Sequence, residues 1–589
     1  MDNEHLCLIN ELKKLKESSK ESVENLDSFS EFKKYMHVKR NVEDELKSLI
    51  LRASSANKSQ LILVCGGVGD GKSHLVSYIL QNFPHIRDSF VLHNDATESF
   101  LPQQTSIDTL NSILENFSDD KIGVHTPKKL ILAINLGALN NFIESEYGRR
   151  FNYLKEFVNN KGILESKIVD NSFDENSYFH FINFSDFHMY SLASDAPKSD
   201  YIRNIFHKVT QQSSSNPFYL TYSQKCTKLC NCADNCPVKF NYELLGKEFT
   251  QNRLISILIE AMIKFKLIIS TRALLNFIYD IIVSTYLDMI PSENLQKEIK
   301  KLTFREHIKF LIPNLIFEHE DLSPIFQTIS KLDPIRLRNE KRDQLVTKFN
   351  TVKNIAFLYK EYIEISDYPH FSTMLAIEGV FLDSEELKQE LIKLFFRLYL
   401  FSPRVGELEY RDEMFSEYVK HLYYFNVGDK NKVKGLYFDI REAIYKWNGK
   451  SSEDRINIFV GKNQLKYRIS QKLYIDPVVG KLEKKDLIEV EKFIPYIKTQ
   501  FSRQDDETVY DLDIDYSLYC LLMDVNKGYR PNKNDKSTYI NFVAFMEKIL
   551  SLGHQDRELV FEQRVGEKIS KYRMNYNKQF DQYSFVRLQ

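Results

Sequence analysis

A short run near the start of the chain reads Gly66-Gly67-Val68-Gly69-Asp70-Gly71-Lys72-Ser73. It fits the pattern G-x-x-x-x-G-K-[ST], in which glycines let backbone N–H groups wrap phosphate oxygens. The apolar run 61–65 before it predicts a buried parallel strand, and the run 74–80 after it predicts a helix. A strand, a glycine loop and a helix in that order are the context expected of a phosphate-binding P-loop.

This glycine loop, residues 66–73, assigns roles to individual side chains. Lys72 is expected to reach the β- and γ-phosphates of a nucleoside triphosphate, and the Ser73 hydroxyl is expected to bind Mg²⁺. The full match and the correct flanks disfavour a chance glycine turn. The motif therefore predicts ATP and Mg²⁺ as cofactors, although it does not say how the energy is used. The predicted nucleotide-binding residues are Gly66, Gly67, Val68, Gly69, Asp70, Gly71, Lys72, Ser73 and His74.

Composition limits the classes of protein to which the chain can belong. Its 589 residues are enough for several domains, and 80 basic residues balance 81 acidic ones. That balance argues against a polycation but leaves a local basic groove open. No run of about 18 apolar residues is present, so no membrane span is expected. With no secretory signal at the start, the chain is expected in the cytoplasm.

Polar residues follow two of the predicted strands, where ligands of α/β sheets gather. Asp95 and Glu98 follow the run 89–95 closely enough to order Mg²⁺ or water, although Asp95 could instead cap a helix. The run 129–135 ends in Asn135, where most P-loop ATPases carry an aspartate. The acid could come from Asp95, Glu98 or Glu144, the strand could be a polar sensor strand, or hydrolysis could be weak. Asn135 could still hydrogen-bond an attacking water.

Two later segments supply further candidates. The aromatic run 178–184 predicts another strand, and Asn183 and Asp186 lie at its end. Arg272 opens a predicted helix, where it would suit a sensor of the γ-phosphate. A surface arginine in a first helical turn is the equal alternative.

Four of the seven cysteines form a dense cluster, the four-cysteine loop: Cys226, Cys230, Cys232 and Cys236. Thiolates are soft ligands, and four of them suit tetrahedral Zn²⁺. An Fe–S cluster is the alternative metal centre. We expect a closed structural zinc knuckle at about 220–245, inserted in the ATPase domain.

The remaining pattern predicts the domain organisation. We expect an N-terminal helical segment (1–50), a P-loop ATPase domain with the metal knuckle (51–290), a helical domain (291–430) and an α+β C-terminal domain (431–589). The predicted fold is thus an α/β P-loop NTPase core, AAA- or STAND-like, with a zinc-knuckle insertion and helical and small α+β domains after it.

Three segments carry a family resemblance: LVCGGVGDGKSH (63–74), HNDATESF (93–100) and LAINLG (132–137). They resemble the DptF family, the F components of bacterial DNA phosphorothioation-dependent restriction systems. The resemblance implies G and H restriction components as partners, with double-stranded DNA inside the complex. It implies an ATPase motor or switch that helps to attack DNA lacking the sulfur mark. Only the glycine-loop residues carry over as functional, and a homo-oligomer is left open.

Three functions compete at this point. The first is an ATP-driven restriction subunit, and the second is a nucleotide-gated scaffold that assembles a DNA-targeting complex with little turnover. The third, a nuclease subunit, is disfavoured because the sequence shows no acid–acid–lysine constellation. Turnover, rather than binding, separates the first two.

Overall fold

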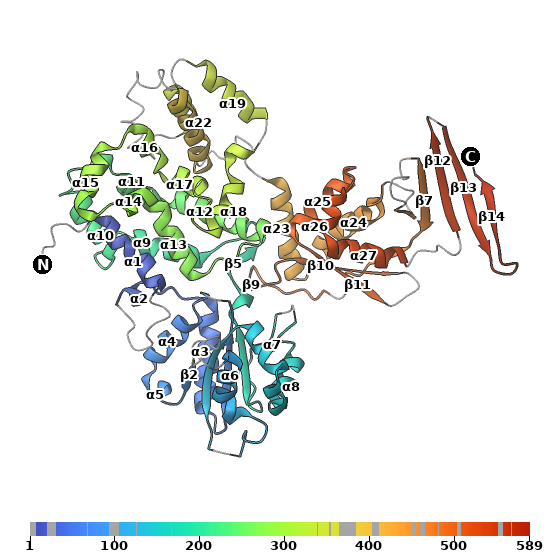
Figure 1. The fold of residues 1–589 in the computed structure, drawn as a ribbon, viewed down its shortest axis with the longest axis horizontal. Coiled ribbons are helices and arrows are strands. Elements are labelled where there is room, and N and C mark those ends of the chain that lie inside the picture. Colours follow the sequence, from blue (N-terminus) through green and yellow to red (C-terminus); the bar gives the residue numbers. More distant parts are fainter. Residues whose placement is uncertain are drawn as a thin grey trace. The chain divides into compact units, whose positions relative to one another are not determined.

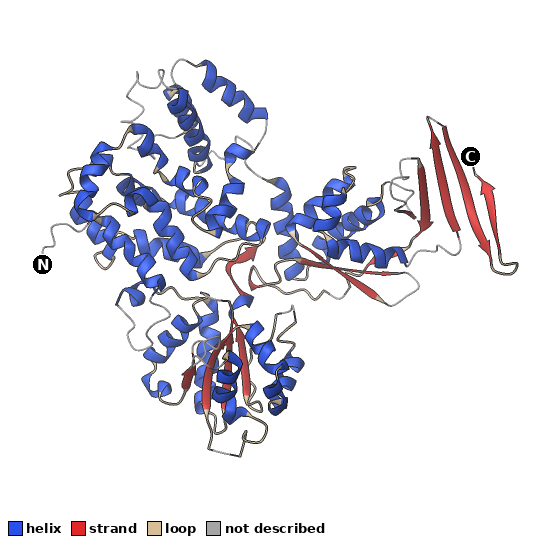
Figure 2. Ribbon diagram, in the orientation of Figure 1, coloured by secondary structure: helices blue, strands red, loops and turns tan. Residues whose placement is uncertain are grey.

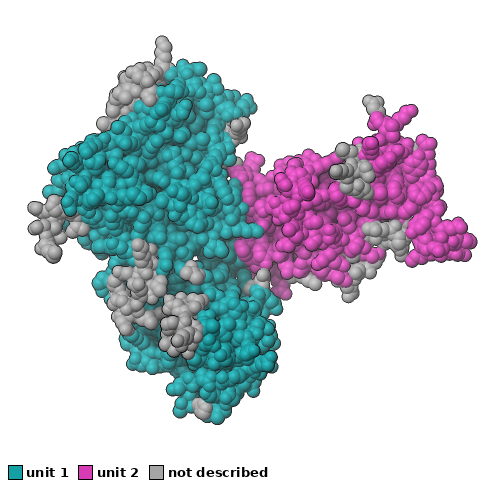
Figure 3. All heavy atoms as spheres, in the orientation of Figure 1, with its two compact units in different colours: residues 1–191, 197–411, 491–493 teal, residues 192–196, 412–490, 494–589 magenta. Residues whose placement is uncertain are grey.

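The computed structural model describes residues 7–20, 31–67, 69–93, 105–124, 126–165, 168–337, 340–352, 355–363, 385–402, 412–449, 454–459, 466–480, 482–503, 508–551, 558–566 and 568–588. These form two compact units, each coloured separately in Figure 3. Unit 1 comprises residues 1–191, 197–411 and 491–493, and unit 2 comprises residues 192–196, 412–490 and 494–589. The division into four domains stays a prediction.

A parallel sheet of four strands lies in unit 1 (Figure 1). Its order is β2 (Val91–His93), β3 (Lys129–Ile134), β1 (Gln60–Cys65), β4 (Phe179–Asn183). Leu63 of β1 pairs with Leu132 on one side and with Phe181 on the other. All six residues of β1 are buried, as its continuous apolar run predicts for a central parallel strand. The mixed α/β character and the strands expected at 61–65, 129–135 and 178–184 are confirmed.

Helices cover both faces of this sheet (Figure 2) because alternate residues of each strand point to opposite sides. Leu61 and Leu63 pack with residues of α6 (Ser106–Leu114), α7 (Leu136–Glu144) and α8 (Asn152–Lys161). Ile62 and Val64 pack on the other face with residues of α3 (Asn41–Ser55) and α4 (Lys72–Asn82). The sheet is therefore the middle of three layers, and its carboxyl edge is left for the loops. The short helix α5 (Pro84–Arg87) follows α4.

The rest of unit 1 is almost entirely helical. Strand β5 (Phe187–Ala193) comes first after the parallel sheet. The helices are α1 (Leu8–Lys20), α2 (Glu31–Met36), α9 (Asp200–Thr210), α10 (Pro217–Thr221), α11 (Pro237–Leu245), α12 (Glu248–Phe265), α13 (Thr271–Ile282), α14 (Thr285–Asp288), α15 (Ser292–Lys301), α16 (Phe304–Lys309), α17 (Ile312–Glu318), α18 (Pro324–Ile329), α19 (Glu340–Thr351), α20 (Ala356–Tyr362) and α22 (Glu385–Leu400). The N-terminal helix α1 packs against α13, α10 and α11.

A buried ion-pair network holds part of this helical region together. Arg397 of α22 is 4% exposed. Its guanidinium donates to Asp333 at 2.7 Å, to Glu318 at 2.6 Å and to the Asn314 side chain at 2.8 Å. A buried charge is tolerated only when it is paired in this way.

Unit 2 combines helices with antiparallel sheets. Its helices are α23 (Glu413–Asn426), α24 (Lys430–Lys446), α25 (Tyr516–Asn526), α26 (Lys533–Thr538) and α27 (Ile540–Ser551). Its larger sheet has the order β14 (Gln582–Arg587), β13 (Lys568–Asn577), β12 (Glu558–Val565), β7 (Tyr467–Lys472), β6 (Arg455–Ile458). A second sheet has the order β11 (Val509–Ile514), β10 (Ile497–Arg503), β8 (Ile475–Pro477), and β9 (Glu489–Lys492) precedes β10 in the chain. Strands β6 and β7 lie in the part of the chain (431–589) for which the sequence predicts an α+β domain.

The sequence predicts no membrane-spanning segment, and the helices of the structure can be compared with that prediction. Among the described residues, none of the helices combines the length and the apolar character needed to cross a bilayer.

Candidate functional site: the glycine loop and its surroundings

The glycine loop connects the end of β1 to the start of α4. Gly69 and Gly71 both have φ of +82°, and Gly66 has φ of +155°. Residues that carry a side chain rarely adopt these backbone conformations, so glycine suits all three positions. Val68, at the middle of the predicted set, lies outside the described residues.

Close packing is a second reason for glycine in this loop. A Cβ atom on Gly69 would lie 2.9 Å from Oγ of Ser270, which caps α13. A Cβ atom on Gly66 would lie 2.9 Å from Cβ of Phe184, in the turn after β4. The loop is thus held between that turn and the first turn of α13. Backbone N–H groups in such a cradle can approach an anion without a side chain in the way.

Two side chains of the loop bond to its own backbone. Lys72 Nζ donates to the carbonyl oxygens of Gly66 at 3.0 Å and Gly67 at 2.6 Å. Asp70 Oδ2 accepts a hydrogen bond from the Gly67 N–H at 2.6 Å. The Lys72 ammonium is therefore held over the loop, where it can exchange carbonyl oxygens for phosphate oxygens. Ser73 and His74 lie in the first turn of α4.

The structure places Asn135 and Arg272 at two different helix starts. Asn135 follows β3, the neighbour of β1, and its Oδ1 accepts from the Ala138 N–H at 2.7 Å. Its oxygen thus caps α7, which the sequence alone did not indicate. Arg272 lies in the first turn of α13, two residues after Ser270, so it is brought towards the glycine loop. The helix expected to begin near Arg272 is confirmed.

The two predicted acids, Asp95 and Glu98, lie outside the residues that the structure describes. Strand β2, which leads to them, ends at His93 and pairs with β3. The sheet order therefore separates the end of β2 from the end of β1 by one strand, β3. Neighbouring strands are ~4.8 Å apart, so these two ends are separated by roughly 10 Å.

Arg40 was missed by sequence reasoning, because no motif includes it. Its Nη1 donates to the Asp70 carbonyl oxygen at 2.5 Å. Its guanidinium lies over the rings of Phe184 at 5.6 Å and Tyr201 at 5.5 Å. The Tyr201 hydroxyl is in turn 2.9 Å from the Thr271 hydroxyl oxygen. Arg40 thus connects the glycine loop to the start of α9 and, through Tyr201, to the start of α13.

Asp186 is an acid near the base of the loop. The Asn183 side-chain amide donates to its Oδ1 at 2.8 Å, while Oδ2 is buried and accepts no hydrogen bond from the described residues. Burial is the main cause that raises the pKa of Asp186 to about 6. Asn183 pairs with Cys65 in the sheet, so its hydrogen bond to Asp186 places that acid near the end of β1. The sequence identified Asn183 and Asp186 as candidates at the end of a strand, but it did not predict that the Asp186 carboxyl is buried.

A pair of histidines lies beside α4. His37 Nδ1 is 3.3 Å from His74 Nε2, and the His37 ring stacks on Tyr78 with ring centroids 3.7 Å apart. Burial, followed by the neighbouring His37 and Lys33, lowers the pKa of His74 to about 4. His74 is therefore neutral near pH 7, and the positive charge on the loop comes from Lys72.

The four-cysteine loop spans a π-helical turn, Tyr222–Cys226, and the start of α11, where Cys236 is the N-cap. The sulfurs of Cys230 and Cys232 are 3.2 Å apart. Cys7, just before α1, lies close by: burial chiefly raises the pKa of its thiol, and Cys230 adds to the rise. Among the residues that the structure describes, however, no three Cys, His, Asp or Glu side chains are arranged to hold a metal ion. The zinc site stays a prediction.

No protein-family model and no curated protein sequence matches the chain. The membership in the DptF family that the sequence suggests therefore stays a prediction.

Proposed function

We propose that the chain binds a nucleoside triphosphate, ATP, at the glycine loop. The observation that carries the proposal is the loop itself: glycines with positive φ, closely packed between Phe184 and Ser270, at the carboxyl edge of a parallel sheet. Backbone N–H groups of the loop and of the first turn of α4 would hold the phosphates, with Lys72 on the β- and γ-phosphates. Ser73 would hold Mg²⁺, which neutralises charge on the phosphates.

Hydrolysis is the second part of the proposal. Parallel strands end at the same edge of a sheet, and Asn135 follows β3, the strand next to β1, while β2 lies one strand further from β1 and ends at His93. Asp95, two residues after β2, would order water in the metal shell, Glu98 would help to polarise the attacking water, and the Asn135 amide would help to orient that water. Arg272 would contact the γ-phosphate from α13.

The cellular role is proposed from the resemblance. The chain would be the ATPase subunit of a bacterial defence complex that restricts DNA lacking phosphorothioate modification. It would act in the cytoplasm with G and H components and double-stranded DNA. A zinc ion in the four-cysteine loop would have a structural role.

The alternative is a nucleotide-gated scaffold with weak turnover. It is favoured by one observation: Asn135 is neutral, and its oxygen already caps α7. In that case ATP would order the contacts around Arg40 and α13 rather than be consumed quickly.

Single-turnover hydrolysis separates the two functions. We expect Asp95→Asn to slow hydrolysis strongly while leaving ATP affinity nearly unchanged, because the acid acts on the reacting geometry. The measurement should be made with and without DNA and partner components. Hydrolysis that is negligible under every condition, with ATP still bound, would favour the scaffold. Unchanged hydrolysis in Asp95→Asn would place the acid elsewhere.

A further inference from the structure

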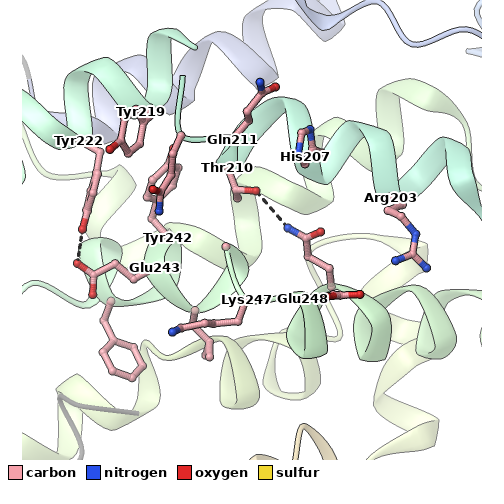
Figure 4. Close-up of a pocket in the computed structure, with 15 residues that line it drawn as sticks. Arg203, His207, Thr210, Gln211, Tyr219, Tyr222, Tyr242, Glu243, Lys247 and Glu248 are labelled. Atoms are coloured by element: carbon pink, nitrogen blue, oxygen red, sulfur yellow. Dashed lines mark hydrogen bonds between the residues drawn. The ribbon is translucent and has the colours of Figure 1, made fainter. Parts of the chain in front are cut away.

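A cavity of about 750 Å³ lies in the helical part of unit 1 (Figure 4). It is lined by α9, by the segment 211–222, by α11 and by the start of α12. Its lining residues all fall within the described range 168–337, and none belongs to the glycine loop or to α13. Pockets of ~300–1,000 Å³ hold small organic ligands, so its size suits a nucleotide.

One end of the cavity is aromatic. The ring centroid of Tyr222 lies 6.1 Å from that of Tyr219 and 5.1 Å from that of Tyr242. The Tyr242 hydroxyl donates to the Val209 carbonyl oxygen at 2.9 Å, and the Tyr222 hydroxyl donates to Glu243 at 2.6 Å. These hydrogen bonds hold the rings of Tyr222 and Tyr242 in place. The aromatic end therefore offers a fixed surface for stacking, with a carboxylate beside it.

The other end carries cations. Figure 4 shows Arg203 and His207 on α9 at the side of the cavity opposite Tyr219 and Tyr222. Arg203 Nη1 donates to the Asn252 side chain at 2.8 Å, which orients the guanidinium. Lys247, exposed just before α12, extends along the cavity between the two ends.

Charge limits what this end can bind. The ionised lining residues are Arg203 and Lys247, which are positive, and Glu243 and Glu248, which are negative. With two cations balanced by two carboxylates, the cavity suits the single negative charge of a phosphodiester better than the several charges of a triphosphate. A flat base fits the aromatic end, and a carboxylate such as Glu243 accepts hydrogen bonds from the amino group of cytosine.

We propose that this tyrosine-lined cavity receives one nucleotide unit of a single-stranded nucleic acid, its base stacked on Tyr219 and Tyr222 and its phosphate held by Arg203 and Lys247. Stacking and a nearby cation are the two elements with which proteins bind single strands without reading a long sequence. The site is independent of ATP binding at the glycine loop. The helix α9 nevertheless reaches both places, because Tyr201 at its start lies beneath Arg40.

The test uses the full chain with Lys72→Ala, so that the glycine loop does not contribute nucleotide binding. Fluorescence anisotropy would measure binding of a labelled ten-nucleotide deoxycytidine strand. We expect Tyr219→Ala to weaken binding about tenfold or more, and Tyr219→Phe, which keeps the ring, to restore it. Lys247→Gln should weaken binding and lower the slope of log affinity against log salt concentration by about 0.7.

Matched controls are available elsewhere in unit 1. Tyr153→Ala removes a tyrosine that is 55% exposed on α8, and Lys297→Gln removes an exposed lysine on α15; neither should change the affinity. No binding of the strand, or equal binding by Tyr219→Ala and its parent, would overturn the proposal. So would competition by a duplex at the concentrations at which an unlabelled copy of the strand competes. Each of these results leaves ATP binding at the glycine loop unaffected, so the two proposals can fail separately.

Discussion

Asp186 offers a test of the electrostatics beside the glycine loop. Burial raises the pKa of this carboxyl from 3.8 to about 6, so the folded chain holds the proton more tightly than the unfolded chain. The contribution of this group to stability is therefore fully present below the unfolded pKa and is lost as the pH rises through about 6. Asparagine at this position cannot titrate, so Asp186→Asn should remove that pH dependence.

The magnitude follows from the two pKa values. A shift of about two units, counted between pH 4 and pH 8, corresponds to about 2.5 kcal/mol as an upper limit. Asp186 is only partly buried, so solvent screening reduces the expected change to about 1 kcal/mol. Asn183 can still donate to the new side chain, whose amide group would occupy the place of the unpaired Oδ2. Replacing the carboxyl group with an amide changes the stability by an amount that does not depend on pH. The prediction therefore concerns only how the stability difference between Asp186→Asn and its parent changes with pH.

Hydrogen exchange of the β4 amides is the suitable assay, because it reports local opening free energy. The only tryptophan, Trp447, lies in unit 2, so its fluorescence does not report on this sheet. Relative to its parent, Asp186→Asn should gain about 1 kcal/mol between pH 4 and pH 8. Asp170→Asn is the control of opposite sign, since hydrogen bonds from Ser172 lower the pKa of Asp170. A difference between Asp186→Asn and its parent that stays constant with pH would refute the reasoning.

Three further predictions concern the loop, the helical core and the metal. Gly69→Ala should reduce ATP affinity at least about tenfold in calorimetry, because the added Cβ would collide with Ser270 and the φ of Gly69 is positive. Unchanged affinity would contradict the proposal that the glycine loop holds the phosphates. Arg397→Met should lower the free energy of unfolding by about 3–5 kcal/mol in urea titration, because it leaves Asp333 buried without its partner, whereas Arg336→Met, at an exposed ion pair, should stay within about 0.5 kcal/mol. Metal analysis of freshly purified protein should find one zinc per chain, lost when the four-cysteine loop is changed to serine; iron with visible absorption, or no metal, would contradict the zinc prediction.

The sequence predicted the elements whose signals are local. Strands β1, β3 and β4 were predictable because a strand buried on both faces must be apolar throughout. The loop was predictable because phosphate binding needs glycines at fixed spacing. The start of α13 was predictable from Ser270 and the residues after it, since a serine caps a helix from its own sequence neighbourhood.

The contacts around the loop were not predictable, because they join residues far apart in the chain. Gly69 meets Ser270, and Arg40 reaches Asp70, only once the helices have packed on the sheet. The raised pKa of Asp186 likewise depends on how deeply the turn after β4 is buried. The tyrosine-lined cavity combines four helical segments, and its lining residues belong to no motif that indicates a binding site. Sequence patterns locate such residues on elements but do not say which elements meet.

The most direct test of the account is ATP binding by the Lys72→Ala chain. Titration calorimetry with MgATP should show one site in the parent, and Lys155→Ala, which removes a lysine on α8, should bind equally well. Lys72→Ala should bind at least about tenfold more weakly, because a charged hydrogen bond to phosphate is worth about 1.5–3 kcal/mol. Equal affinity in Lys72→Ala and the parent would contradict the assignment of the glycine loop as the nucleotide site.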